Sequence, residues 1–106
     1  MSIQVAPTGH SRILSVGTYR PKRVVPNSEI VERIESTDEW IQQRTGIESR
    51  RFAGDDETVI SMAKAACEMA LQRAKLTIAD IDTVILATIS YPFQAPSAST
   101  ELINEL

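Results

Sequence analysis

The chain contains a single cysteine, Cys67, and a single histidine, His10, among its 106 residues. An internal disulfide or a cysteine zinc cluster needs more than one cysteine, and the lone histidine excludes any site built on two. No apolar run approaches the roughly 20 residues that a membrane helix needs. These absences argue against disulfide-stabilised, cysteine-zinc and membrane-spanning proteins. They leave a reducing, cytoplasmic location as the default expectation.

The charge balance argues against a nucleic-acid-binding protein, and the start of the chain argues against a secreted one. A net charge of −3 argues against a general affinity for nucleic acid, which needs a basic face, although a local basic pocket is compatible with it. Residues 1–11 lack the charged-then-apolar order of a secretory signal, and we expect them to form a flexible leader. With 42% hydrophobic and 24% charged residues the composition is that of a soluble globular protein, and 12–106 are predicted to form one unit.

The first half of the chain predicts short elements. The β-forming residues of 12–18 predict a strand. Asn27 is a candidate cap for a short helix. A second helix is predicted over about 38–44, with capping residues before it and Gly46 as its stop signal, and an extended stretch over 47–52 follows.

The longest predicted helix runs over 57–75, because apolar residues, many of them alanine, recur there at steps of three and four. Acidic residues at 55–57 favour a helix start through the macrodipole. Thr77 and Asp80 have the spacing of a capping box for a final turn.

The last third of the chain predicts a strand, a loop and a helix. The nearly unbroken apolar run 83–89 is typical of a strand covered on both faces. Two prolines predict a loop over 91–96, and Ser97 is the candidate cap of a helix over 98–106. Strands alternating with helices indicate an α/β fold. A doubly covered strand needs neighbours that this chain scarcely offers, so we expect the 106 residues to be part of a larger domain.

Three features that invite a chemical interpretation have simpler explanations. Cys67 lies in the middle of a predicted helix, far from a helix start that would lower its pKa, so we interpret it as a small core residue. His10 lies in the leader and is expected to be solvated. The acidic run 55–57 lacks further metal ligands and is explained by the helix start, so no metal site is predicted.

Trp40 and Arg44 are the most informative pair, because a spacing of four places both on one face of a short helix. An indole can stack on a planar base, and a guanidinium can stack or bind phosphate, so the pair suits a nucleotide. Arg50 and Arg51 could add positive field. The simpler alternative stays open: Trp40 anchors the helix to the core and Arg44 makes a surface ion pair. No glycine-rich phosphate loop supports the nucleotide hypothesis.

Several segments, in this order, resemble the amino-terminal part of the β-ketoacyl-acyl-carrier-protein synthase III family. The combination Asp-Glu-Trp-Ile with Arg-Thr-Gly-Ile over 38–47 carries most of the resemblance. It extends from about Arg12 to the end of the chain through matching segments at 13–21, 25–27, 50–53, 57–58, 62–63, 80–82 and 96–98.

The resemblance implies the amino-terminal part of a thiolase-like fold, with a mixed sheet and packed helices that are incomplete in this chain. It also implies a homodimeric acyltransferase that starts fatty-acid synthesis. In that reaction an acyl group from acyl-CoA, a substrate rather than a cofactor, moves to a cysteine and condenses with malonyl-acyl carrier protein. The family's catalytic cysteine, histidine and asparagine lie beyond residue 106, so the resemblance implies no catalytic residue in this chain and no activity of the chain alone.

The resemblance assigns binding roles to four residues. Trp40 matches the tryptophan that stacks on the CoA adenine, and Arg44 matches the arginine that assists from the other side. Ser36 aligns with a hydroxyl residue near the adenine, which is usually threonine in the family. Ala95 lies in the loop that shapes the acyl pocket across the dimer, and a small residue there implies longer or branched acyl primers.

Alternative functions stay open at this point. The chain could be a non-catalytic module or structural fragment that holds CoA or another nucleotide, or it could belong to a priming ketosynthase of polyketide biosynthesis.

Overall fold

The computed structural model describes residues 9, 11–90 and 92–106. These residues form two compact units, which we call the hairpin unit (Arg20–Thr58) and the helical unit (the described residues of Met1–Tyr19 together with Val59–Leu106). Most of the predicted leader, with His10, lies outside the described residues. Among the described residues, none of the helices has the length and apolar character needed to cross a bilayer.

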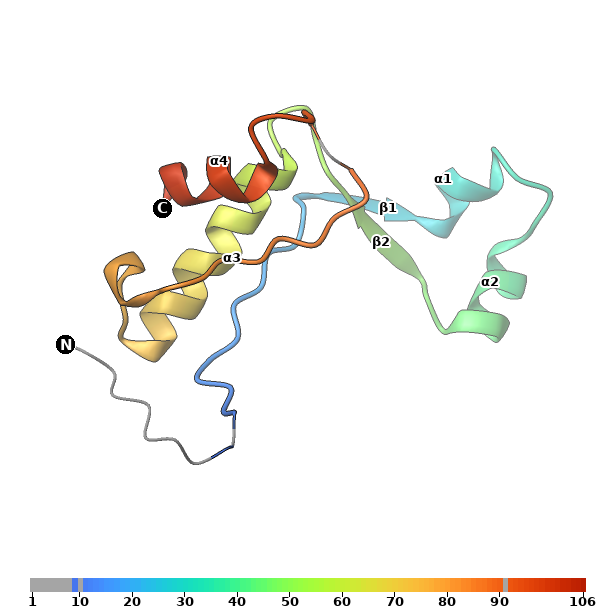
Figure 1. Cartoon of the computed structure of the whole chain (residues 1–106). Helices are drawn as coiled ribbons and strands as arrows, with labels where there is room; N and C mark the ends of the chain where they lie inside the picture. Colours follow the sequence, from blue (N-terminus) through green and yellow to red (C-terminus); the bar gives the residue numbers. More distant parts are fainter. Residues whose placement is uncertain (1–8, 10, 91) are drawn as a thin grey trace. The chain divides into compact units, whose positions relative to one another are not determined.

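An antiparallel pair of strands organises the hairpin unit (Figure 1). Strand β1 (Arg23–Pro26) pairs with β2 (Ser49–Phe52), with Val25 opposite Arg50. Val25 is 1% exposed and belongs to the small core of this unit. The extended stretch predicted over 47–52 is therefore confirmed as β2. Strand β1 was not predicted, because it ends at a proline, which cannot donate to a strand ladder.

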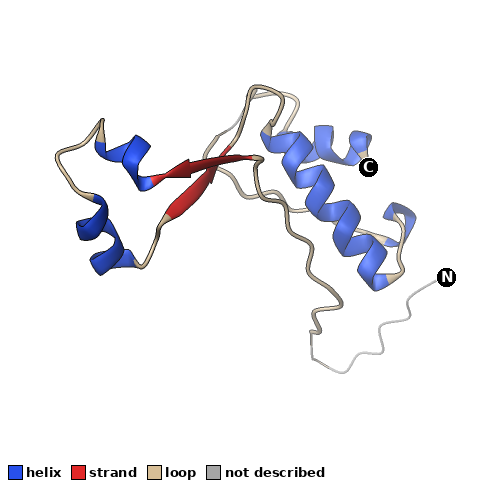
Figure 2. Ribbon diagram, turned by 180° about the vertical axis from the view of Figure 1, so that it is seen from behind, coloured by secondary structure: helices blue, strands red, loops and turns tan. Residues whose placement is uncertain are grey.

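Two short helices follow β1 in the hairpin unit: α1 (Asn27–Val31) and α2 (Asp38–Thr45). Both lie at the same end of the paired strands (Figures 1 and 2). The prediction that Asn27 caps a helix is wrong. The cap position is Pro26, and the Asn27 side chain makes no cap bond but is buried and bonded to distant residues.

The helical unit is built on α3 (Val59–Ala74), followed by a 3-10 turn, η1 (Ile78–Asp80), and by α4 (Ala98–Glu105) (Figure 2). Helix α4 contacts α3, and Leu102 of α4 is 2% exposed. The predicted helices are confirmed, with α3 beginning two residues later than expected. The two caps predicted in this unit, Thr77 with Asp80 and Ser97, are also confirmed, because each depends only on residues within one turn.

The acidic run 55–57 therefore precedes α3 instead of opening it. Glu57 is 8% exposed, and its carboxylate accepts hydrogen bonds from the backbone N–H groups of Lys22 (3.1 Å) and Gly54 (2.9 Å). Asp56 pairs with the Lys22 ammonium at 3.1 Å. These two carboxylates therefore connect the segment before α3 to Lys22, the residue before β1.

The strands predicted over 12–18 and 83–89 are wrong for this chain. Among the described residues, no strand pairs with either segment. Their side chains nevertheless alternate between half-buried and exposed, which is the period of an extended backbone. Ile85 is 87% and Ile89 100% exposed, so the outer side of the second segment is uncovered. Both segments thus have strand-like sequences, but among the described residues no neighbouring strand pairs with them.

The first of these segments approaches α3 very closely at Gly17. A Cβ atom built there would lie 1.9 Å from the Ala66 carbonyl oxygen and 2.6 Å from the Ala70 nitrogen. The Ser15 hydroxyl donates to the Ala70 carbonyl at 2.7 Å, and Arg73 donates to the Val16 carbonyl at 2.7 Å. The alanine stripe of α3 therefore permits backbone contact, as its small side chains predict.

Candidate functional site

Helix α2 carries Trp40 and Arg44, and local signals define both of its ends. At its start, the Thr37 hydroxyl accepts a hydrogen bond from the Trp40 backbone N–H at 3.2 Å. At its end, Gly46 has a φ of 68°, a left-handed conformation that glycine adopts without strain, and donates to the carbonyl four residues earlier at 2.7 Å. The predicted helix over 38–44 is thus confirmed.

Trp40 and Arg44 meet on one face of α2, as their spacing predicted. The centre of the Arg44 guanidinium lies 5.7 Å from the Trp40 ring centroid. Such a contact is worth about 0.5–1 kcal/mol at an exposed site. Trp40 is 55% exposed, whereas Ile41, the buried residue of α2, is 6% exposed. Ile41 therefore anchors the helix, and the large aromatic ring of Trp40 is available at the surface.

A hollow of 350 Å³ adjoins the Trp40 ring. Ser36, the third residue predicted to contact the nucleotide, lines this hollow together with Trp40. Its hydroxyl oxygen is buried and has no hydrogen-bond partner among the described residues. An unpartnered buried hydroxyl costs about 1–3 kcal/mol, so it is a group that a ligand could satisfy. The remaining lining residues are Ile34, Glu35 and Thr37.

The structure assigns Arg50 and Arg51 to other contacts. Arg50 donates to the Asn27 side-chain oxygen at 3.2 Å, and Arg51 donates to the backbone carbonyls of Pro21 and Lys22, both at 3.1 Å. Arg44 is the arginine that stands beside the exposed ring. These acceptors are neutral, so both guanidinium groups keep their charge, and the expectation that Arg50 and Arg51 add positive field stays a prediction.

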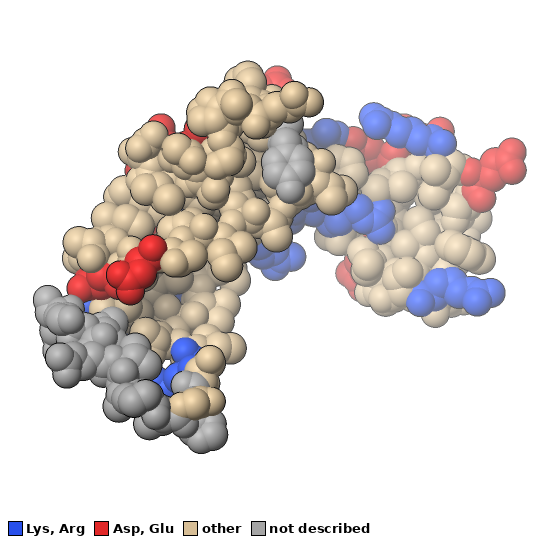
Figure 3. Space-filling view, viewed as in Figure 1, with Lys and Arg blue, Asp and Glu red and all other residues tan. Residues whose placement is uncertain are grey.

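The charges of the hairpin unit are mixed. On the face visible in Figure 3, basic and acidic side chains are interspersed on this unit and do not form one continuous basic surface. The visible face of the helical unit carries few charges.

Asp38, the first residue of α2, is held by two amides. Gln42 donates to one of its oxygens at 2.9 Å and Asn27 to the other at 2.7 Å. These two hydrogen bonds, of which that from Gln42 contributes more to the shift, lower the pKa of Asp38 below its ordinary value of 3.8. The involvement of Asn27 was missed, because nothing near it in sequence indicates a partner 11 residues away.

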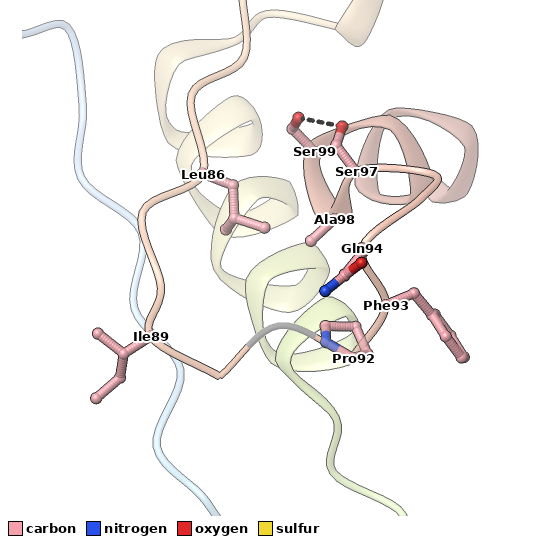
Figure 4. A pocket seen from close by; sticks show the side chains of 8 residues that line it. All are labelled: Leu86, Ile89, Pro92, Phe93, Gln94, Ser97, Ala98 and Ser99. Atoms are coloured by element: carbon pink, nitrogen blue, oxygen red, sulfur yellow. Dashed lines mark hydrogen bonds between the residues drawn. The ribbon is translucent and has the colours of Figure 1, made fainter.

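Ala95, the fourth predicted site residue, belongs to the helical unit, whereas α2 belongs to the hairpin unit. It precedes Ser97, which accepts a hydrogen bond from Thr100 N–H and caps α4 as predicted. A hollow of 610 Å³ lies beside this loop, and Ala95 does not line it. Figure 4 shows its lining side chains, with the Ser97 and Ser99 hydroxyls 3.0 Å apart; the others are Leu86, Ile89, Pro92, Phe93, Gln94 and Ala98.

The described residues contain no arrangement suited to covalent or metal chemistry. Cys67 is half-buried on α3, and His10 lies outside the described residues. Among the described residues, no three His, Cys, Asp or Glu side chains are grouped closely enough to hold a metal ion. The groups on and beside α2 are suited to stacking, charge and hydrogen bonding, and the hairpin unit that carries them contains neither a cysteine nor a histidine.

The comparisons with known proteins show what this chain is similar to. A search of protein-family models finds none that matches. The mycobacterial β-ketoacyl-acyl-carrier-protein synthase III of Mycobacterium tuberculosis is 52% identical over 99 residues, which are 91% of this chain and 30% of the relative. A synthase III of Streptomyces avermitilis is 46% identical over 97 residues, or 92% of the chain and 27% of the relative. The chain is homologous to the amino-terminal portion of β-ketoacyl-acyl-carrier-protein synthase III.

Solved structures show the same relationship. The priming β-ketosynthase of the R1128 polyketide pathway matches with a TM-score of 0.84 and 45% identity, over 89% of this chain and 28% of that one. The synthase III of Aquifex aeolicus also matches with a TM-score of 0.84, at 35% identity, over 91% of this chain and 31% of that one. The fold is therefore part of the thiolase-like fold of synthase III, as predicted. The chain spans about 30% of the length of the curated relatives it matches.

Proposed function

We propose that this chain provides the CoA-recognition part of a synthase III acyltransferase. The reaction is the decarboxylative condensation of acyl-CoA with malonyl-acyl carrier protein, which starts a fatty-acid chain. The observation that carries the proposal is the grouping on and beside α2: an exposed Trp40 ring, Arg44 against it, and the unpartnered Ser36 hydroxyl in the adjoining hollow. In this proposal the adenine lies on the free face of Trp40, and Arg44 contributes its charge.

The proposal places catalysis outside these 106 residues. The hairpin unit contains neither a cysteine nor a histidine, so the chain alone is expected to bind CoA without being acylated. A homodimer, malonyl-acyl carrier protein as second substrate and a cytoplasmic location belong to the same proposal. Its support is the homology to synthase III over about 90% of the chain.

CoA titration of the 106-residue chain tests the binding part of the proposal. Trp40 is the only tryptophan, so its fluorescence reports directly on the site. We expect weak, saturable quenching, because stacking of a base on one aromatic ring contributes about 1–3 kcal/mol. The Arg44→Ala variant should bind more weakly, while Arg33→Ala, which removes an exposed arginine outside the site, should match the unaltered chain. Equal binding by all three proteins would contradict the proposed role of Arg44.

Labelling with radioactive acetyl-CoA tests whether the chain alone becomes acylated. We expect no stable label on the chain. A label that disappears in the Cys67→Ser variant would show that Cys67 is a nucleophile and would overturn its interpretation as a packing residue. Quenching without labelling is the expected result, and it also describes a non-catalytic CoA-binding module. Activity of the chain when joined to the remainder of a synthase III separates those two functions.

A priming ketosynthase of polyketide biosynthesis is the second candidate. The specific observation in its favour is the match to the R1128 priming β-ketosynthase, whose identity of 45% exceeds the 35% of the Aquifex aeolicus synthase III at the same TM-score. The small residue at Ala95 agrees with a primer longer than acetyl in the acyl pocket. Comparing acyl-carrier proteins from the two kinds of pathway as condensation partners would discriminate the candidates.

A further inference from the structure

One buried amide holds both ends of α2. Asn27 is 1% exposed, and its side-chain nitrogen donates to the Asp38 carboxylate at 2.7 Å and to the Ile47 carbonyl at 2.6 Å. Asp38 is the first residue of the helix, and Ile47 follows its C-cap, Gly46. The Asn27 backbone N–H also donates to the carbonyl of Glu48 at 3.1 Å. Contacts 11 and 20 residues along the chain therefore converge on this residue.

The orientation of the Asn27 amide follows from its neighbours. Its nitrogen faces two acceptors, a carboxylate and a carbonyl, while its oxygen faces a donor, the Arg50 guanidinium at 3.2 Å. Both amide hydrogens and the oxygen are thus used, and rotating the amide by 180° would oppose like groups at all three contacts. Two charged side chains, Asp38 from α2 and Arg50 from β2, face the amide.

Helix α2 needs tertiary contacts to hold its position. The helix has eight residues, and isolated helices of this length are marginal in water. Its buried apolar residue is Ile41, and the ring of Trp40 is more than half exposed. The hydrogen bonds of Asn27 therefore add polar contacts at both ends of the helix to the apolar contact made by Ile41.

We propose that Asn27 is a positioning residue for the nucleotide site, because its single amide fixes both ends of the helix that carries the tryptophan and the arginine. The inference rests on the proposed CoA function of α2. Asn27 itself does not line the hollow beside Trp40, so it acts through the placement of α2 and not through contact with the ligand.

Three variants of the 106-residue chain test this role. Asn27→Asp preserves the size of the side chain but places a second carboxylate against Asp38 and removes the donor to Ile47. The double variant N27D/D38N reverses the polarity of the first contact, so that the new amide donates to the new carboxylate, while the bond to Ile47 stays lost. Glu57→Gln is the control, since it perturbs another buried polar side chain of the same unit, one that accepts hydrogen bonds from the backbone N–H groups of Gly54 and Lys22.

The first readout is Trp40 emission without ligand, measured in folded samples verified by circular dichroism. We expect N27D to alter the emission maximum and the quenching by acrylamide, and E57Q to leave both unchanged. The second readout is CoA affinity, which should fall about tenfold in N27D at pH 7.5 and stay within twofold in E57Q.

The pH profile separates positioning from a general loss of stability. In N27D the paired carboxylates and their burial raise the pKa of the pair, against the opposing effect of Arg50, so one proton is taken up as the pH falls toward 5. The protonated form regains a donor, and the N27D deficit should shrink at pH 5. The double variant lacks the carboxylate pair, so it should bind with intermediate affinity and show no such recovery.

The results of these measurements separate a failure of the positioning role from a failure of the proposed function. If the unaltered chain does not bind CoA, the proposed function fails, and the ligand-free Trp40 readout alone decides the positioning role. If the chain binds CoA and N27D binds equally well at pH 7.5, the positioning role is overturned. The same conclusion follows if E57Q alters the Trp40 readouts as much as N27D does.

Discussion

A single methyl group added at Gly17 tests the packing of the helical unit. In Gly17→Ala the new Cβ would meet the Ala66 carbonyl oxygen at 1.9 Å and the Ala70 nitrogen at 2.6 Å, and both are backbone atoms of α3. A flexible side chain could turn away, but helix backbone cannot, so the segment around residue 17 must move off the helix. That movement lengthens the hydrogen bonds made by Ser15 and Arg73.

The expected loss follows from these contacts. Overpacking costs about 1–3 kcal/mol, and weakening two hydrogen bonds adds about 1 kcal/mol, so the free energy of unfolding should fall by about 2–4 kcal/mol. With a urea m-value of about 2 kcal/mol/M, the midpoint should fall by about 1–2 M. Circular dichroism at 222 nm is the suitable signal, because α3 is the longest helix.

The matched control is Gly54→Ala in the hairpin unit. A Cβ there would meet the Asp56 carboxylate at 3.1 Å, and this exposed side chain can rotate away. The substitution also restricts the unfolded chain, so its effect should lie within about 0.5 kcal/mol of zero. If Gly17→Ala were as mild as Gly54→Ala, the close approach of the chain to α3 would be refuted.

Three further predictions concern the site. Ser36→Ala should leave stability unchanged or raise it by about 1 kcal/mol, because it removes an unpartnered buried hydroxyl, while weakening CoA binding; a clear loss of stability in urea would contradict this. Ala95→Phe should shift acyl-CoA preference toward shorter primers in a chimera that joins this chain to the rest of the Mycobacterium tuberculosis synthase III, and an unchanged preference would rule out the pocket role. Asp38 has a pKa lowered by Gln42 and Asn27, so it stabilises the fold above about pH 4 and this contribution is lost as the pH falls through the folded-state pKa. Acid unfolding followed by Trp40 fluorescence should therefore be less steep in Asp38→Asn, and identical acid profiles would refute the linkage.

Local sequence signals predicted the ends of the helices well. Thr37 and Ser97 accept the expected capping bonds, and Gly46 ends α2 in a left-handed conformation. The Thr77–Asp80 capping box forms as well. All of these interactions join residues within one helical turn, so a short window of sequence contains both partners.

Strand pairing and side-chain partners were not predictable in the same way. The segments 12–18 and 83–89 have strand-like composition, but a strand also needs a neighbouring strand, which the described residues do not provide for either. Strand β1 was missed for the converse reason: its partner strand, Ser49–Phe52, lies far along the chain, and its own proline, Pro26, argues against a strand.

By itself the sequence determined the helices, the caps of all but the first, the common face of Trp40 and Arg44, and the family resemblance that the comparisons confirmed. The spacing of four is enough to bring two side chains together on a helix, because helix geometry is local. Only the tertiary structure decided that Trp40 is exposed, that Ser36 shares a hollow with it, and that Asn27 joins the two ends of α2. Those relations depend on how segments 10 to 20 residues apart pack together, and no local pattern of residues encodes that packing.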